Sequence, residues 1–299
     1  MRVGVALPVG ENPDRGRTAL AYRELRELTL ATEDGGLDSI WLADHLFYQP
    51  ADEPPLGLWE AWTILTALAE ATERVELGQL VLCIPFRNPG LLAWMANTLD
   101  EVSGGRFVLG LGAGWHEPEF RAFGFDFDHR VGVFADSLEV AIPLLREGRT
   151  DYDGRFALGH AELRPRGPRP GGPPILIASK GPRMNRLSAR WADRWNTAWY
   201  GPPAEPFWQR RAALHAACEE LGRDAAEMEI TVGLLVSDES AIAGGEDRSR
   251  TLTVGAEQIA EGLAAWRDEG VAEVMCRLNP STPAMVERLA RATEILRAP

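Results

Sequence analysis

Apolar positions along the chain alternate between short continuous runs and longer stretches with helical spacing. Val75–Leu82 and Phe107–Ala113 are rich in apolar and β-branched residues and are bounded by glycine or proline, as is typical of strands buried on both faces. Between them, Pro89 can occupy the first turn of a helix whose apolar positions run from Leu91 to Leu99, and Gly104-Gly105 ends it. The pattern predicts consecutive strand–loop–helix units.

The same alternation continues through the whole chain and gives eight strand-like runs, each followed by a helical pattern. Eight parallel strands can close a barrel, so the sequence predicts an α/β fold of the TIM (β/α)8 barrel type. The expected strands are Val3–Pro8, Ser39–Asp44, Val75–Leu82, Phe107–Ala113, Pro174–Ser179, Trp195–Tyr200, Ile230–Val236 and Glu273–Leu278. The expected helices are Thr18–Asp34, Leu58–Glu73, Gly90–Glu101, Arg130–Arg146, Pro182–Ala192, Pro206–Leu221, Ala256–Glu269 and Pro283–Leu296.

One segment, Asp151–Pro173, interrupts this alternation. Asp153-Gly154 indicates a hairpin turn, and the end rich in Arg, Pro and Gly indicates an irregular loop. We interpret the segment as an insertion between the fourth helix and the fifth strand. A second polar segment, Asp238–Arg250, predicts a mobile loop above the seventh strand. A chain of 299 residues fits one barrel with insertions as well as two domains, and we expect residues 1–299 to form a single domain.

Composition and charge exclude several classes of protein. Only three cysteines occur, Cys83, Cys218 and Cys276, with no paired spacing, and no run approaches the ~18 apolar residues of a membrane span. We therefore expect a reduced cytoplasmic protein without a metal site, and the apolar core of a signal peptide is absent from the N-terminus. A net charge of −13 argues against nucleic acid and anionic membranes as partners. Any anionic ligand needs a local basic cluster.

Polar residues follow the second predicted strand, at Asp44-His45. Because the carboxyl ends of barrel strands meet at the mouth, both side chains are expected where a ligand would lie. Histidine suits proton transfer, since its ordinary pKa is near neutrality. The alternative is that Asp44 caps a turn and His45 bonds to the backbone.

The fifth strand runs into its helix through Ser179-Lys180-Gly181-Pro182. A hydroxyl, an ammonium and free backbone N–H groups at a helix N-terminus form the outline of an anion site. Lys180 is the only lysine among 31 basic residues, and Arg183 and Arg186 follow on the first turns of the helix. An anionic ligand would offset their unfavourable position at the positive end of the helix dipole, whereas the alternative is that they are solvated surface residues.

The run Gly110-Leu111-Gly112-Ala113-Gly114 resembles a dinucleotide fingerprint but lacks its third glycine and acidic partner. We expect these glycines instead to let a planar ring approach the barrel backbone. Most tryptophans are expected in the core or in subunit contacts, with Trp115 and Trp199 at strand ends as the best pocket candidates. We find neither a nucleophile elbow nor histidine spacing for a metal.

Taken together, these stretches resemble the bacterial luciferase-like flavin- and deazaflavin-dependent oxidoreductases. The resemblance is carried by GLDSIWLADHL, GGRFVLGLGAGWHEPEFRAFG, PPILIASKGP and VGAEQIAEGLAAWRDEGVAEVMCRL, and it extends nearly from end to end. It implies a TIM-type barrel with an insertion, usually dimeric, with reduced FMN or coenzyme F420 over the carboxyl ends of the strands.

The resemblance also implies roles for particular residues. Asp44 and His45 match the pair that touches the deazaflavin and serves proton transfer, and Leu80-Val81 matches a bulge, often with a cis peptide, behind the ring. Ala113-Gly114 lies beside the ring, and Ser179–Gly181 falls where a loop grips phosphate. The family more often has glycines at Ser179-Lys180. The sugar-phosphate dehydrogenase branch has a catalytic Glu where Trp115 stands, which argues against that reaction here.

Our leading hypothesis is an oxidoreductase that uses coenzyme F420 for hydride transfer to or from a small organic substrate, with His45 as general acid or base and Asp44 beside it. A monooxygenase using reduced FMN and oxygen is the close alternative, and a catalytically silent flavin-binding barrel is the second. The predicted cofactor-binding residues are Asp44, Leu80, Val81, Ala113, Gly114, Ser179, Lys180, Gly181 and Arg183. The predicted substrate pocket comprises Phe47, Trp59, Trp115, His116 and Trp199. A homodimer is expected, with apolar residues of the second and third helices covering one another or a second subunit, namely Trp62, Leu65, Leu68, Trp94, Met95 and Leu99.

Overall fold

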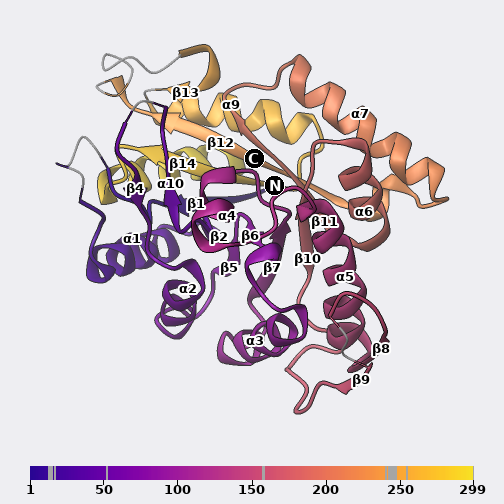
Figure 1. Ribbon diagram of the computed structural model, residues 1–299. Coiled ribbons are helices and arrows are strands. Elements are labelled where there is room, and N and C mark those ends of the chain that lie inside the picture. The colour runs from indigo at the N-terminus through magenta and orange to yellow at the C-terminus, as the bar shows by residue number, and fades with distance from the viewer. Residues whose placement is uncertain are drawn as a thin grey trace.

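The computed structural model describes residues 1–12, 16, 18–51, 53–156, 159–239, 241, 248–253 and 255–298. Its centre is a closed barrel of eight parallel strands surrounded by helices, a TIM barrel (Figure 1). The strands pair in the ring order β1 (Arg2–Leu7), β2 (Ser39–Leu42), β5 (Glu76–Gln79), β7 (Phe107–Gly112), β10 (Ile175–Ala178), β11 (Arg194–Tyr200), β12 (Glu229–Ser237) and β14 (Glu273–Asn279). All eight predicted strands are confirmed.

Helices cover the outside of the barrel, and the eight predicted ones are present. They are α1 (Tyr22–Asp34), α2 (Ala61–Glu70), α3 (Pro89–Val102), α5 (Arg130–Glu147), α6 (Pro182–Trp191), α7 (Glu205–Glu220), α9 (Ala256–Asp268) and α10 (Pro283–Arg297). A short helix, α4 (Glu117–Phe123), lies in the loop after β7. The remaining short elements are β3 (Phe47–Tyr48), β4 (Leu56–Gly57), β6 (Leu82–Cys83), β13 (Leu252–Thr253), η2 (Ile84–Phe86), η3 (Ala225–Glu227) and η4 (Arg248–Arg250).

The boundaries of α3 follow from its sequence. The Asn88 side chain accepts a hydrogen bond from the Leu91 N–H, and Pro89 occupies the first turn, where it removes no helical hydrogen bond. The helix ends before Gly104 and Gly105, whose φ angles of 61° and 84° lie in the left-handed region that glycine favours. The start and stop signals therefore act as predicted.

The barrel interior is filled by a few large side chains. Trp41, Val108, Leu176 and Met275 form one buried cluster inside the ring. Gly78 of β5 leaves room for the Trp41 ring, because a Cβ at this position would lie 2.3 Å from Trp41 Cζ3. The interior is therefore a packed core, and ligands are confined to the ends of the barrel.

The amino-terminal end of the barrel carries a network of paired charges. Arg2, Glu76, Arg194, Glu229 and Glu273 are each the first residue of their strand. Arg194 bonds to Glu76 at 2.8 Å and to Glu229 at 2.9 Å, and Arg2 pairs with Glu229 and, at 3.3 Å, with Glu273. Two guanidinium groups thus hold three carboxyl groups at strand starts.

Glu273 is the fully buried member of this network. Its Oε1 accepts hydrogen bonds from Ser39 Oγ at 2.5 Å and from Trp41 Nε1 at 3.1 Å. Burial raises the pKa of the Glu273 carboxyl, and the Ser39 hydrogen bond with the charges of Arg2 and Arg194 opposes that rise. The network has one carboxyl in excess, and Glu273 is the member for which the neutral form is favoured.

The segment after α5 contains an antiparallel pair, β8 (Arg149–Tyr152) with β9 (Gly159–Glu162), beyond the end of that helix (Figure 1). The hairpin predicted around Asp153-Gly154 is confirmed, whereas its status as an insertion stays a prediction. The predicted mobile loop at 238–250 falls largely on residues 240 and 242–247, which lie outside the described residues. Of the helices that the structure describes, none has the length and apolar character needed to span a membrane.

Candidate active site

Asp44, predicted at the mouth of the barrel, is buried and holds Arg87. The two Asp44 oxygens accept bonds from the Arg87 guanidinium at 2.6 and 2.9 Å, and Oδ2 also accepts the Cys83 N–H at 2.8 Å. Burial disfavours the charge of Arg87, but the hydrogen bonds and negative charges of Asp44 and Glu60 together outweigh this effect and raise the pKa of the guanidinium. Arg87 also bonds to Glu60 at 3.0 Å, so that one ion-pair cluster joins the loops after β2 and β5 to the start of α2.

His45 does not pair with Asp44, although the two are adjacent in sequence. Its Nδ1 lies 2.6 Å from Glu119 Oε1, while Glu119 Oε2 accepts the Leu46 N–H at 2.7 Å. The Glu119 side chain is 1% exposed and that of His45 is 24% exposed. Because a carboxylate at Nδ1 favours a proton on that nitrogen, Nε2 is left to give or take a proton at the surface.

The sequence alone did not reveal Glu119 or Arg87 as partners in the site. Both stand in the loops IPFRNP and AGWHEPEF, whose polar content was the available signal. Their partners lie 74 and 43 positions away along the chain, so the pairings depend on the barrel bringing neighbouring strand ends together.

His116 is buried and neutral. Its Nε2 accepts the Gln49 N–H at 2.9 Å, which requires this nitrogen to be unprotonated. Burial lowers the pKa of the His116 imidazole, the nearby His45 lowers it further, and Glu119 opposes the shift. The hydrogen bond ties the loop after β2 to the loop after β7.

Aromatic rings surround His45. The Trp115 ring lies 5.6 Å from His45 and 6.1 Å from Tyr48, measured between ring centroids, and Phe47 lies 6.1 Å from His116. Trp115 is 62% exposed. The structure therefore brings Phe47, Trp115 and His116 of the predicted pocket together around His45.

The other two predicted pocket residues have different surroundings. Trp59 is exposed and its Nε1 donates to the Leu20 carbonyl at 2.8 Å. Trp199 follows a cis peptide bond from Ala198 in β11, and its ring packs where a Cβ of Gly233 would stand, 2.9 Å from Trp199 Cε3. No ring contact to the His45 cluster joins either residue within the described part of the chain.

Gly110 and Gly112 of β7, and Gly114 after it, stand close to other parts of the chain. A Cβ at Gly110 would lie 2.0 Å from the Gln79 carbonyl oxygen, one at Gly112 would lie 2.5 Å from Val81 Cγ2, and one at Gly114 would lie 2.5 Å from Phe120 Cζ. The chain itself therefore requires glycine at these positions, and the approach of a planar ring stays a prediction. The Leu80-Val81 peptide bond is cis, as the resemblance implied.

Lys180, between β10 and α6, and Arg183, in the first turn of α6, are exposed and have neither an ion-pair partner nor a hydrogen bond to any described residue. Partial burial and the neighbouring Arg210 charge lower the pKa of the Lys180 ammonium. The first residue before α6, Gly181, provides no side-chain cap, so the N–H groups of the first turn stay open. Two unpaired cations beside an uncapped helix start fit an anionic group.

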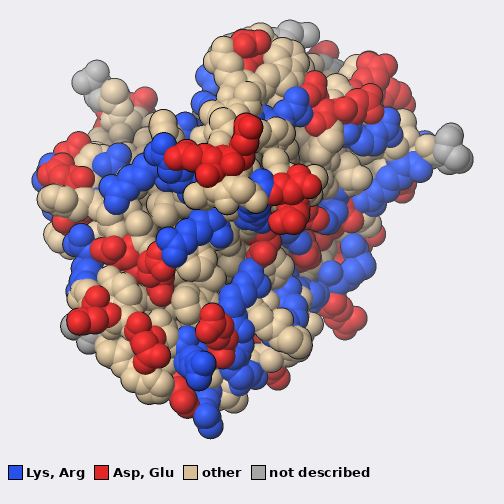
Figure 2. Space-filling model, turned by 90° about the vertical axis from the view of Figure 1, so that its right-hand side faces the viewer, with Lys and Arg blue, Asp and Glu red and all other residues tan. Residues whose placement is uncertain are grey.

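Two neighbours of this turn are engaged elsewhere. The Ser179 hydroxyl donates to Asn185 at 2.7 Å and accepts the Trp195 indole N–H at 2.8 Å. Arg186 pairs with Glu220 of α7 at 2.9 Å, so it does not join the cationic cluster that the sequence suggested. Basic and acidic side chains intermingle on the face formed by α5, α6 and α7 (Figure 2). An anion site on this face is therefore indicated by basic side chains without acidic partners and not by the total charge.

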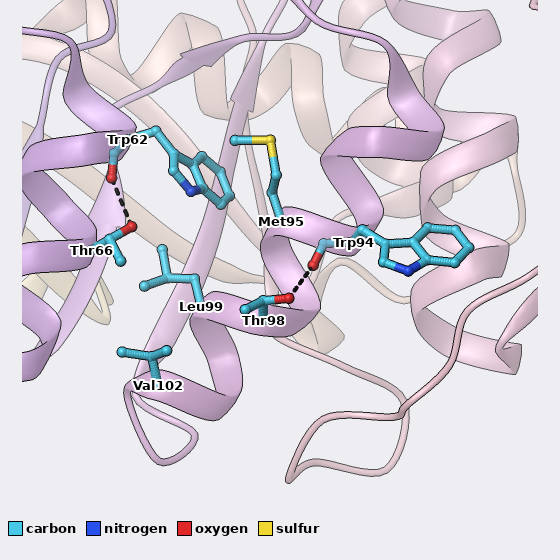
Figure 3. Close-up of a pocket in the computed structure, with 7 residues that line it drawn as sticks. All are labelled: Trp62, Thr66, Trp94, Met95, Thr98, Leu99 and Val102. Atoms are coloured by element: carbon cyan, nitrogen blue, oxygen red, sulfur yellow. Dashed lines mark hydrogen bonds between the residues drawn. The ribbon is translucent and has the colours of Figure 1, made fainter.

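An apolar groove lies on the outer surface, away from the mouth, between α2 and α3. Figure 3 shows Trp62 of α2 facing Met95 and Leu99 of α3 across a volume of about 240 Å³. Leu65, Leu68 and Leu99 are buried, whereas Trp94 and Met95 are partly exposed at the groove. Thr66 and Thr98 donate their hydroxyls to carbonyls one turn back in their helices, which leaves the groove lining largely apolar.

A carboxylate-held histidine, a group of aromatic side chains and two cations without partners among the described residues thus stand after the strands of a TIM barrel, where enzymes of this fold carry their active sites. The chain belongs to the luciferase-like monooxygenase family, whose sequence model matches residues 1–241.

The relatives of known activity include both reductases and oxygenases. The chain is 31% identical over 175 residues to 5,10-methylenetetrahydromethanopterin reductase of Archaeoglobus fulgidus, covering 58% of this chain and 48% of the relative. It is 34% identical over 181 residues to F420-dependent glucose-6-phosphate dehydrogenase of Amycolatopsis mediterranei, covering 57% and 52%. Pyrimidine monooxygenase RutA of Methylorubrum extorquens is 31% identical over 170 residues, covering 52% and 46%. The chain thus matches about half the length of these relatives.

Solved structures share the whole fold at lower identity. An F420-dependent secondary alcohol dehydrogenase in complex with an F420-acetone adduct superposes with a TM-score of 0.80 at 17% identity over 99% of both chains. Monooxygenase RslO1 from Streptomyces bottropensis superposes with a TM-score of 0.79 at 20% identity over 100% of both chains. At such identities the likeness shows the fold alone.

Proposed function

We propose that the protein is a luciferase-like oxidoreductase that uses coenzyme F420 and passes a hydride between the deazaflavin ring and a small organic substrate. The observation that carries this proposal is the partly exposed His45 imidazole, fixed at Nδ1 by the buried Glu119 carboxylate, with no partner for Nε2 among the described residues. Relatives named for F420-dependent dehydrogenation support the choice of cofactor.

In this proposal, His45 handles the proton that accompanies the hydride. The bound coenzyme supplies a ring carbon that accepts or donates the hydride, and His45 Nε2 takes the proton from a substrate hydroxyl or returns it to a carbonyl oxygen. Glu119 stabilises the imidazolium that forms and keeps the ring in one orientation. Asp44 contributes by fixing Arg87 and the Cys83 backbone beneath the site.

The same proposal assigns the cofactor to the side of the mouth formed by β5, β7 and β10. Lys180 and Arg183 would hold its phosphate together with the N–H groups at the start of α6, since all three lack partners in the described residues. Ser179 would contribute through its backbone, because its hydroxyl is engaged. The cis Leu80-Val81 bond and Ala113-Gly114 would border the ring.

A monooxygenase that uses reduced FMN is the second candidate. The observation in its favour is the match to a pyrimidine monooxygenase at an identity equal to that of the reductase. The aromatic side chains around His45 would then serve to exclude water from a reactive flavin. A barrel that binds flavin without turnover is the third candidate.

The decisive experiment is a titration of the purified protein with coenzyme F420, FMN and reduced FMN, followed by fluorescence and by single-turnover assays with and without oxygen. We expect coenzyme F420 to bind tightest and to be reduced or oxidised without oxygen. Tighter binding of reduced FMN with oxygen consumption would favour the monooxygenase. Tight binding of either cofactor without turnover across a broad substrate panel would favour the silent barrel.

We also propose that two copies of the chain pair through the groove between α2 and α3. Trp94 and Met95 present partly exposed apolar surface there, next to Leu91 and Val102, which are 60% and 44% exposed. Contiguous apolar surface of this kind is uncommon on monomers and typical of self-complementary interfaces.

A further inference from the structure

The exposed aromatic side chains gather around His45. Nine large apolar side chains are strongly exposed in the described residues. Four of them, Tyr48, Trp59, Trp115 and Phe123, belong to the segments after β2 and β7, and Tyr48, Trp115 and Phe123 gather near His45. They are linked through rings: Tyr48 contacts Trp115 at 6.1 Å, and Phe123 contacts Phe47 at 6.3 Å. Leaving such rings in water costs about 25 cal/mol per Å² of apolar area, so their gathering at one place indicates a surface that is covered when occupied.

The described charges beside this aromatic surface are engaged by neighbouring groups, the Arg130 guanidinium by the Gly114 and Phe127 carbonyls and by the Phe127 ring. The Asp44 carboxylate is held by Arg87, the Glu119 carboxylate faces His45, and Glu117 pairs with Arg121 at 2.9 Å. The unpaired cations stand instead at the start of α6. An anionic substrate would therefore find no free cation among the described residues next to His45, and its desolvation would be uncompensated.

The His45 ring presents an open polar atom at this surface. The ring uses Nδ1 for Glu119, and its Nε2 has no partner among the residues that the structure describes. The imidazole lies 5.6 Å from the Trp115 ring, with the two planes at 79°. A molecule lying on Trp115 would thus have an open imidazole nitrogen beside it.

We infer that the substrate is an uncharged molecule with a flat apolar or aromatic body, which lies on Trp115 and Tyr48 and directs a carbonyl or hydroxyl oxygen at His45 Nε2. This inference rests on the proposed function. In the oxidative direction the substrate C–H bond breaks and its electron pair leaves as hydride to the oxidised deazaflavin. The hydroxyl proton passes to Nε2, and the C=O bond forms. In reverse, the reduced deazaflavin supplies the hydride and His45 the proton.

The test uses two probes of nearly equal shape, acetophenone and 4-acetylbenzoate, which differ by one negative charge. Binding to the protein without cofactor is measured by equilibrium dialysis, and turnover is measured separately with reduced coenzyme F420. We expect acetophenone to bind at least tenfold tighter than 4-acetylbenzoate. Trp115→Ala should weaken acetophenone binding at least tenfold, and Trp115→Phe should restore it to within threefold.

Trp208→Ala provides the matched control, because Trp208 is an exposed tryptophan on α7 and takes no part in the aromatic surface. Equal or tighter binding of the carboxylate, or equal binding by the Trp115→Ala and Trp208→Ala variants, would overturn the inference. If acetophenone and the variants bind as expected but no flavin or deazaflavin supports turnover, the substrate surface is supported and the proposed function is contradicted. Failure of the inference and failure of the proposed function are therefore distinguishable. Circular dichroism confirms that each variant is folded.

Discussion

The two ends of the barrel are built from the same strands and yet are opposite in character. At the amino end, the charged residues that begin five strands pair with one another around the buried Glu273. At the carboxyl end, Lys180 and Arg183 have no partners in the described chain, and aromatic rings stand exposed around His45. Paired charges at the amino ends of the strands stabilise the fold, whereas unpaired groups at the carboxyl ends are available to a ligand. Strand β2 illustrates this, since it begins at Ser39, which donates a hydrogen bond to Glu273, and is followed by His45.

The largest effect is expected at the amino end. Glu273→Ala should lower the free energy of unfolding by about 3–5 kcal/mol, because it removes the buried acceptor of the Ser39 hydroxyl and takes one partner from each of Arg2 and Arg194. Glu273→Gln should lose far less, since the raised pKa of the carboxyl already favours a neutral group there. Urea denaturation measures both. Equal losses for the two variants would contradict this account of the network.

At the carboxyl end, His45→Ala should slow the chemical step by roughly 100-fold or more while the variant keeps its fold and most of its cofactor affinity, as expected for loss of a general acid or base. Stability should fall less than in Glu273→Ala, because Glu119 keeps its hydrogen bond from the Leu46 N–H. Single-turnover kinetics with saturating cofactor provide the measurement. An unchanged rate would reduce His45 to a structural role.

Lys180→Ala should weaken cofactor binding by about 1.5–3 kcal/mol, the range for a charge-assisted hydrogen bond, and should flatten the dependence of affinity on salt. Arg186→Ala is the matched control, because Arg186 is paired with Glu220 and should affect binding little. Fluorescence titration of each variant with the cofactor at low and high salt measures both effects. Parental affinity in the Lys180 variant would show that this turn does not hold the phosphate.

A smaller effect is expected from pH at His116. Because its folded-state pKa is lowered, the neutral ring contributes stability fully above the unfolded value of about 6.5, and this contribution is lost as pH falls through the lower folded value. The parent should therefore lose stability relative to His116→Gln between about pH 7 and 5. Thermal unfolding across this range tests the sign. A difference between the two proteins that does not vary with pH would refute it.

A substitution in the groove between α2 and α3 should have the smallest effect on the two ends of the barrel. The parent should have the mass of a dimer in light scattering, and Trp94→Glu should shift it toward monomer while cofactor affinity stays within about threefold, because Trp94 lies on the outer surface. A monomeric parent at micromolar concentration would contradict the proposed pairing.

Periodicity was sufficient to predict the barrel, because buried parallel strands and amphipathic helices leave strong local patterns. It did not show that the third predicted strand, Val75–Leu82, is divided into β5 and β6, although the resemblance implied a bulge, often with a cis peptide, at Leu80-Val81. His45 was found from its place at a strand end. Its partner Glu119 was missed, because a contact across 74 positions has no local signature.

Gly110, Gly112 and Gly114 illustrate a different limit of the sequence. Their spacing resembled a ligand-binding feature, and glycine was correctly taken as a sign of close approach. The approaching atoms belong to Gln79, Val81 and Phe120 of the same chain. Sequence indicates that something comes near a glycine, whereas the identity of that neighbour is a property of the assembled barrel.

The packing of Trp41 against Gly78 has an evolutionary consequence. With only 2.3 Å available for a Cβ at position 78, neither residue can change alone: a larger residue at 78 collides with the indole, and a smaller one at 41 leaves a void. The two positions are therefore expected to substitute as a pair among descendants of this chain. Since the Trp41 indole N–H also reaches Glu273, such a paired change would have to preserve a hydrogen bond at the amino end of the barrel.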